Sequence, residues 1–160
     1  MGFFSKPDDA PHTTNTPLTK ERIAAFLTRQ EWYFSEDSDG DLGGSWDDNV
    51  FYFFVLGSND EVLQVRGRWK HTLPLERQAD FLLFADDFHR SRPWPKAYTA
   101  EEGGELAIYT EVSFDLEYGV ADDQLGQFIA SGLFTGLRFF EALGEHLGIV
   151  DEPGDQGQGE

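Results

Sequence analysis

The chain has 160 residues, of which 30 are Asp or Glu and 12 are Lys or Arg, so its formal net charge is −18 at pH 7. We expect no nucleic-acid partner, because phosphate binding needs a basic surface. The absence of cysteine excludes disulfide bonds and cysteine-ligated zinc. No stretch reaches the roughly 18 apolar residues of a membrane span, and the first residues do not resemble a signal peptide. These features predict a cytoplasmic protein without a membrane partner.

In the first third of the chain, the sequence predicts a tail, a helix and short strands. Prolines interrupt polar residues over 1–17, which predicts a disordered N-terminal tail. A helix is expected from Thr19, as N-cap, to about Arg29. A short strand at 31–35 and a turn at 36–41 follow, because Asp-Gly at 39 and 40 is a hairpin signal.

The middle of the chain predicts the main strands, at 42–46, 50–56 and 62–70. Residues 50–56 are seven apolar side chains in a row, bounded by turn formers. Because side chains alternate across a sheet, both faces of this strand are apolar, and we predict a central strand covered on both sides. In 62–70, by contrast, apolar residues alternate with polar ones, so that strand should bury one face.

A second helix is predicted from Leu73 or Pro74 to Arg90. Its apolar surface is wide, which predicts burial on more than one side, with a second subunit as one candidate for the cover. Strands at 96–100 and 105–114 should follow.

The last predicted helix runs from Asp122 to Leu147, before an acidic, Gly-rich tail at 149–160 that we expect to be disordered. Gly132 and Gly136 lie on one side of this helix, and two glycines there indicate that a neighbouring element packs very closely. The element order is α-β(3-4)-α-β-β-α. It predicts a single α+β domain over 18–148, with three helices and an antiparallel sheet of five to six strands.

Several short motifs, in this order, resemble the YbjN family of bacterial proteins, also labelled sensory transduction regulators. The matching residues are Asp39-Gly40-Asp41-Leu42-Gly43-Gly44 with Trp46, Phe51-Tyr52-Phe53, Val65-Arg66-Gly67-Arg68-Trp69, Pro93-Trp94-Pro95-Lys96 with Tyr98, and Glu111-Val112-Ser113. The resemblance looks closest to the actinobacterial branch. It implies a fold like that of type III secretion chaperones, which are small homodimers, and it implies no catalytic residues.

Basic residues form the main candidate site. Half of the Lys and Arg residues could meet if the second helix ends beside the third main strand: Arg66, Arg68, Lys70, Arg90, Arg92 and Lys96. Such a patch, with Trp69 and Trp94 nearby, could bind a protein partner, a carboxylate, a phosphate or an acidic peptide. Alternatively, these residues pair with neighbouring Asp and Glu side chains.

Two weaker candidates remain. Asp37, Asp39 and Asp41 place oxygen ligands at alternate positions, as calcium loops do, although the glycine at position 40 suits a hairpin instead. Trp46, Trp69, Trp94 and Tyr98 could line a peptide groove or pack in the core. No H-E-x-x-H, P-loop, G-x-S-x-G or Rossmann fingerprint is present, so we predict no cofactor.

The sequence therefore favours a non-enzymatic, homodimeric protein-interaction domain with a chaperone-like or regulatory role and an unknown protein partner. Two alternatives stay open. One is a small anionic-ligand or enzymatic domain that uses Arg66, Arg68 and Arg92. The other is a calcium-responsive protein that uses the turn from Asp37 to Asp41.

Overall fold

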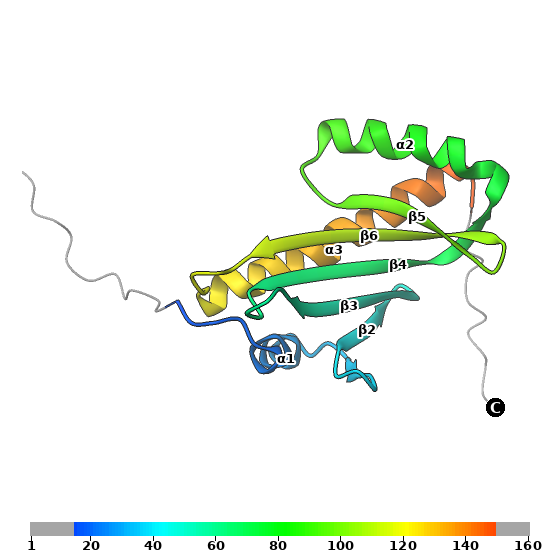
Figure 1. The fold of residues 1–160 in the computed structure, drawn as a ribbon. Coiled ribbons are helices and arrows are strands. Elements are labelled where there is room, and N and C mark those ends of the chain that lie inside the picture. The colour runs from blue at the N-terminus through cyan, green and yellow to red at the C-terminus, as the bar shows by residue number, and fades with distance from the viewer. Residues whose placement is uncertain (1–14, 150–160) are drawn as a thin grey trace, which may run out of the picture.

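The computed structural model describes residues 15–149 of the chain as three α-helices and one sheet (Figure 1). The six strands are antiparallel, in the spatial order β1-β2-β3-β4-β6-β5. This arrangement confirms the predicted α+β class. The elements in chain order are α1 (Lys20–Arg29), β1 (Ser35–Glu36), β2 (Leu42–Trp46), β3 (Asn49–Leu56), β4 (Val62–Pro74), the short 3-10 helix η1 (Leu75–Arg77), α2 (Gln78–Ser91), β5 (Lys96–Glu102), β6 (Glu105–Asp115) and α3 (Asp122–Leu147).

Helix α3 lies directly on the sheet, and Figure 1 shows it passing behind β4 and β6. A Cβ atom added at Gly132 would lie 2.5 Å from the Cβ of Val65, and one at Gly136 would lie 2.8 Å from both the Phe51 ring and Thr110 Oγ1. Any larger side chain at these positions would push the helix off the strands. The predicted close packing at the two glycines is thus confirmed, and the partner is the sheet.

The two faces of β3 differ in their surroundings. Phe51 and Phe53 are fully buried on the face that carries α3. Tyr52 and Phe54, on the other face, are only half-buried, and Val50 and Leu56 beside them are exposed. The prediction that β3 is covered on both faces is therefore wrong. The reason is that the helices of residues 15–149 bury their apolar side chains on one side of the sheet, so neighbouring side chains alone shield the second face.

Helix α1 begins as predicted. Thr19 caps it, since its Oγ1 accepts a hydrogen bond from the backbone N–H of Arg22. Thr16, within the segment predicted as a tail, pairs with Val120 in an isolated bridge, and the Arg22 guanidinium donates to both of their carbonyl oxygens. The remainder of that tail, residues 1–14, lies outside the described residues, as does 150–160.

Two predicted boundaries are wrong. The strand expected at 31–35 is reduced to Ser35–Glu36, because Glu31 has a left-handed φ of 57° and Trp32 still donates to the carbonyl of Leu27 at the end of α1. The second helix begins at Gln78 rather than at Leu73 or Pro74. Strand β4 instead continues past an irregularity between Arg68 and Thr72 and pairs with β6 as far as Pro74.

Helix α2 buries one stripe and exposes another. Phe81, Ala85 and Phe88 are buried, and the Phe81 and Phe88 rings make edge contacts with Phe139 of α3. Leu82 and Leu83 are 55% and 73% exposed. The wide apolar surface that the sequence predicts for this helix is thus buried along one stripe in the single chain, and the stripe with Leu82 and Leu83 stays exposed.

Candidate functional site

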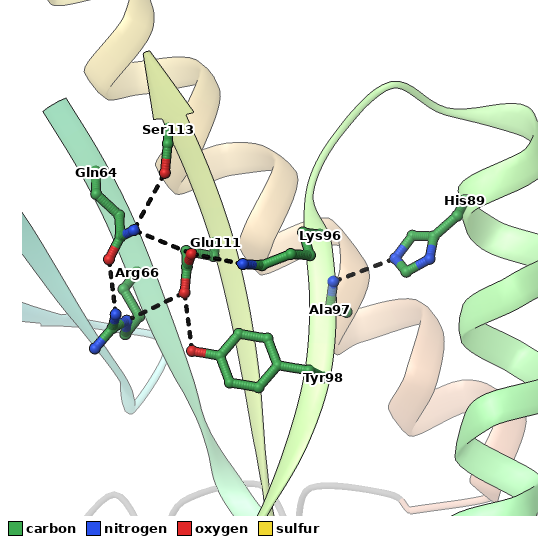
Figure 2. A network of polar contacts seen from close by, with 8 residues as sticks. All are labelled: Gln64, Arg66, His89, Lys96, Ala97, Tyr98, Glu111 and Ser113. Carbon is green, nitrogen blue, oxygen red and sulfur yellow. Dashed lines mark hydrogen bonds and ion pairs between the residues drawn. The ribbon is translucent and has the colours of Figure 1, made fainter. Parts of the chain in front are cut away.

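The uncovered sheet face carries a network of polar side chains centred on Glu111 of β6 (Figure 2). Strand pairing builds it, because Glu111 lies opposite Arg66 of β4 on one side and Lys96 of β5 on the other. Residues opposite each other in adjacent strands point to the same face. We call this surface the open face and define it by Tyr52, Phe54, Gln64, Arg66, Arg68, Lys96, Tyr98, Tyr109 and Glu111.

Glu111 accepts hydrogen bonds from both neighbouring strands, β4 and β5. Its Oε1 receives hydrogen bonds from Lys96 Nζ at 2.7 Å and from Gln64 Nε2 at 3.0 Å, and its Oε2 receives one from the Tyr98 hydroxyl at 2.9 Å. Arg66 Nε lies 3.4 Å from Oε2, an ion-pair distance, although this buried N–H has no aligned hydrogen-bond acceptor. The Glu111 side chain is only 10% exposed, so protein groups largely replace its water.

The network changes the pKa values of its acidic members. Burial alone would raise the pKa of Glu111, but hydrogen bonds from Lys96 and Tyr98 and the charges of Lys96 and Arg66 lower it overall. Burial, followed by the hydrogen bond to the Glu111 carboxylate, raises the pKa of Tyr98 to about 12. At neutral pH the site therefore holds an ionised carboxylate beside a neutral phenol.

A second pair extends the open face along β4 and β6. Arg68 Nη2 donates to Glu102 Oε2 at 3.0 Å, and the Tyr109 hydroxyl donates to the other oxygen of Glu102. The Arg68 pair and the Glu111 network are linked by aromatic rings, because Tyr98 and Tyr109 stack with centroids 5.5 Å apart.

Aromatic side chains also support the cations of this face. The Arg66 guanidinium lies 5.0 Å from the centre of the Phe54 ring, and Phe54 stacks on Tyr52. Lys96 Nζ lies 5.3 Å from the centre of the Tyr98 ring. Such cation–π contacts hold the charged group over a ring while part of that charged group stays in water. The open face therefore combines flat aromatic surface with charges whose positions are fixed.

The eight residues predicted to form one basic and aromatic patch do not come together. Arg66, Arg68 and Lys96 lie on the open face. Arg90 pairs with Asp86 on α2, and the Arg92 guanidinium lies 4.3 Å from the centre of the Phe88 ring. The other three residues lie elsewhere: Lys70 and Trp69 line a groove beside α3, and Trp94 packs edge-on against Phe114.

The aspartates considered as a calcium loop serve a turn. Asp37 Oδ1 accepts from the backbone N–H groups of Asp39 and Asp41, and the Asp41 carboxylate pairs with Lys20 Nζ at 3.2 Å. Within residues 15–149, no group of three or more His, Cys, Asp or Glu side chains is arranged to hold a metal ion. The hairpin interpretation explains this turn.

Sequence reasoning missed Glu111 as the centre of the network, along with Gln64 as one of its donors. A signal was present, since Glu111 is an acidic residue between Thr110 and Val112 in a strand that otherwise buries one face. Its partners could not be named without the strand register.

The fold and the open face define a small α+β protein whose uncovered sheet carries paired charges and aromatic rings. The sequence model of the family described as "YbjN: Putative bacterial sensory transduction regulator" matches residues 19–145. The chain belongs to the YbjN family, as its motifs indicated. No curated protein matches the sequence of this chain.

Three solved structures share the fold. YbjN from E. coli, described as a putative transcription regulator, superposes with a TM-score of 0.67 at 12% identity, and the match covers 82% of this chain and 96% of that one. An uncharacterized protein from Methanothermobacter thermautotrophicus has a TM-score of 0.54 at 14% identity, over 80% and 98% of the two chains. A chain of the HopA1-SchA chaperone–effector complex has a TM-score of 0.50 at 16% identity, over 78% and 99%. The last match bears out the expected likeness to type III secretion chaperones.

No helix within residues 15–149 is long and apolar enough to cross a membrane.

Proposed function

We propose that this chain is a non-enzymatic protein-interaction domain with a chaperone-like or regulatory role, and that it binds its partner through the open face. One observation carries the proposal. No helix of residues 15–149 covers this sheet face, which presents the aromatic and arginine side chains that protein interfaces favour, namely Tyr52, Phe54, Arg66, Arg68 and Tyr109.

The state of the charged groups supports binding of a protein over catalysis or capture of a small anion. Arg66 and Lys96 share Glu111, and Arg68 is held by Glu102. A site for a small anion needs cations whose donors are available to the ligand. A flat surface with internally paired charges instead fits a partner that adds contacts around the existing pairs. The family description as a regulator and the chaperone fold of a structural neighbour agree with this proposal.

We also propose that the chain acts as a homodimer through α2, in the cytoplasm. Leu82 and Leu83 lie side by side in sequence on this helix and are more than half exposed. Leu75, just before α2, is a further exposed apolar residue. Apolar side chains grouped in this way mark an interaction surface more often than singly scattered ones do.

Affinity capture from an extract of the native cells tests the open face. The variant Arg66→Ala/Arg68→Ala removes two cations from the face, and Arg29→Ala removes one from α1, where Arg29 lies over Phe26. We expect the double variant to lose proteins that the wild type and Arg29→Ala both retain. Equal capture by all three chains would contradict binding at the open face.

Sedimentation velocity at micromolar concentration tests the dimer. We expect the wild type to sediment as a dimer and Leu82→Glu/Leu83→Glu to sediment as a single 18.1 kDa chain. Asp86→Ala/Asp87→Ala, which alters exposed charges of the same helix, should leave the dimer intact. A wild-type protein that is entirely monomeric would contradict the proposal.

A further inference from the structure

A long groove lies on the helical side of the molecule, away from the open face. It has a volume of about 1100 Å³ and runs between α3 on one side and, on the other, the turn of residues 47–49 with residues 69–71 of β4. Its lining on α3 extends from Gln127 to Glu145. At roughly 1.5 Å per helical residue this stretch measures about 27 Å. A groove of that length is better matched to a segment of polypeptide than to a compact small molecule.

Apolar side chains form the floor and part of one wall of this groove. Trp69 and Phe140 are buried at its base and stack on each other with centroids 6.4 Å apart. Phe134 contributes to the wall, and its side chain is 55% exposed although it makes an edge contact with Trp32. An exposed ring next to a buried aromatic floor is the type of pocket in which an apolar anchor of a partner is held.

The turn that forms the opposite wall is fixed in place. Asp47 and Asp48 have left-handed φ values of 51° and 63°. Asn49, which is buried, donates its side-chain amide to the carbonyls of Trp46 and Asp47 and accepts from the backbone N–H of Lys70. The Asn49 side chain thereby ties the turn to β4, so this wall of the groove is held in place by hydrogen bonds.

Acidic side chains surround the apolar floor. Asp47 and Asp48 lie on the turn, and Glu141 and Glu145 lie on α3. None of these four carboxylates has an ion-pair partner among residues 15–149. The lining also contains Lys70 and Arg138, so carboxylates outnumber permanent cations by four to two. The chain as a whole has a charge of −18, which increases the attraction for a cation.

We propose that this groove binds a cationic amphipathic helix of a partner protein. The apolar side of the helix would occupy the floor at Trp69 and Phe140 and contact Phe134 in the wall, and its Lys or Arg side chains would reach the carboxylates on either wall. Laying an amphipathic helix into an apolar groove is a recurrent mode of recognition, and charges on the rim select the partner. The proposal adds a second surface to the proposed interaction function, on the opposite side of the sheet from Glu111.

Fluorescence anisotropy with the full-length protein tests the groove. The probe is a labelled model helix of about 18 residues, built from Leu and Lys so that Leu forms one side. A matched probe carries Glu in place of Lys. We expect the Lys helix to bind and the Glu helix not to bind. Glu141→Gln/Glu145→Gln should weaken the binding about two- to tenfold, and Phe134→Ala about fivefold or more.

A matched variant separates the groove from general attraction to an acidic protein. Glu101→Gln/Glu117→Gln makes the same change in net charge at exposed positions outside the groove, and it should bind the Lys helix as the wild type does. Equal weakening by the two double variants, or binding of both probes alike, would overturn the proposal.

Other occupants of the groove give distinct results. If Phe134→Ala abolishes self-association in sedimentation, the occupant is a second copy of this chain. If Asp151→Asn/Glu152→Gln in the full chain strengthens binding of the Lys helix at least tenfold, the occupant is the chain's own C-terminal segment. Either result would overturn the proposal and leave the capture experiment on Arg66 and Arg68 unaffected, because those variants lie on the open face.

Discussion

The two faces of the sheet are built from the same strands, yet they hold their side chains in different ways. On the helical face, Phe51 and Val65 are excluded from water by α3, and Phe53 is fully buried with its ring edge-on to Trp46. On the open face, Tyr52, Phe54 and Arg66 shield one another by stacking and cation–π contact. The comparison shows that an apolar residue in a strand does not reveal by itself whether another layer covers it. A side chain can be half-buried by its own neighbours.

The largest expected difference between the faces concerns two adjacent residues of β3. Phe53→Ala removes a fully buried ring and leaves a cavity, so we expect the free energy of unfolding to fall by about 3–5 kcal/mol. Phe54→Ala removes a half-buried ring, and we expect a loss of about 1 kcal/mol. Urea unfolding of the two variants measures both losses. Equal losses would mean that the open face is covered in solution.

A smaller effect tests the contact between α3 and the sheet. Gly132→Ala places a methyl group against Val65, and we expect the free energy of unfolding to fall by about 1–3 kcal/mol even though alanine favours the helix. Ser131→Ala, one position earlier, is the control and should change stability by less than about 0.5 kcal/mol. A stabilised Gly132→Ala protein would show that the helix can move away from the strand.

The ionised state of Glu111 should make the open face sensitive to acid. Glu111→Gln is expected to lower the free energy of unfolding at pH 7 by about 1–2 kcal/mol, because Lys96 and Arg66 lose their charged partner. The folded protein lowers the pKa of Glu111 below the usual 4.5. This stabilisation is therefore present above that pH and is lost as the pH falls through the folded-state value.

Unfolding measured from pH 7 to pH 3 checks this prediction. The difference between wild type and Glu111→Gln should stay constant above about pH 4.5 and shrink below it. Glu117→Gln, an exposed carboxylate outside the network, serves as the control and should change stability at pH 7 by less than about 0.5 kcal/mol. A difference that is independent of pH would rule out a lowered pKa at Glu111.

The smallest expected effect concerns Tyr98. Its pKa is raised to about 12 in the folded protein, so the neutral phenol is favoured, and this stabilisation is lost as the pH rises from 10 through the folded value. Tyr98→Phe should cost about 0.5–1.5 kcal/mol at neutral pH through the lost hydrogen bond to Glu111. Tyrosinate absorbance is measured against pH for both proteins. Subtracting the curve of Tyr98→Phe from that of the wild type should leave one transition, that of Tyr98, near pH 12. A transition near pH 10 would contradict the network geometry.

Local patterns predicted much of the fold. Helix α3, with its buried glycines, and the cap of α1 at Thr19 follow from periodicity and capping chemistry that short segments contain. The predicted start of α2 was wrong because Pro74 suits the first turn of a helix. In the structure, the row of buried residues Leu63, Val65 and Trp69 continues along β4 to Leu73. That continuing alternation was the available signal.

The candidate site was harder to predict, for a physical reason. The sequence places Arg66 and Arg68 on one face of a strand, but it does not show that Glu111 and Glu102 lie within reach of them. Strand register decides this, and a shift of one residue would turn every side chain to the other face. Likewise, the groove beside α3 depends on where the turn at 47–49 lies relative to a helix that begins only at Asp122.

The glycine contacts of α3 have a consequence for how partners are met. Because Gly132 and Gly136 let the helix backbone rest directly on the side chains of Val65, Phe51 and Thr110, this layer cannot slide or tilt without breaking van der Waals contact. The open face and the groove are therefore preformed before any partner arrives. Association at either one would require little reorganisation of this chain, so most of the ordering entropy would be lost by the partner.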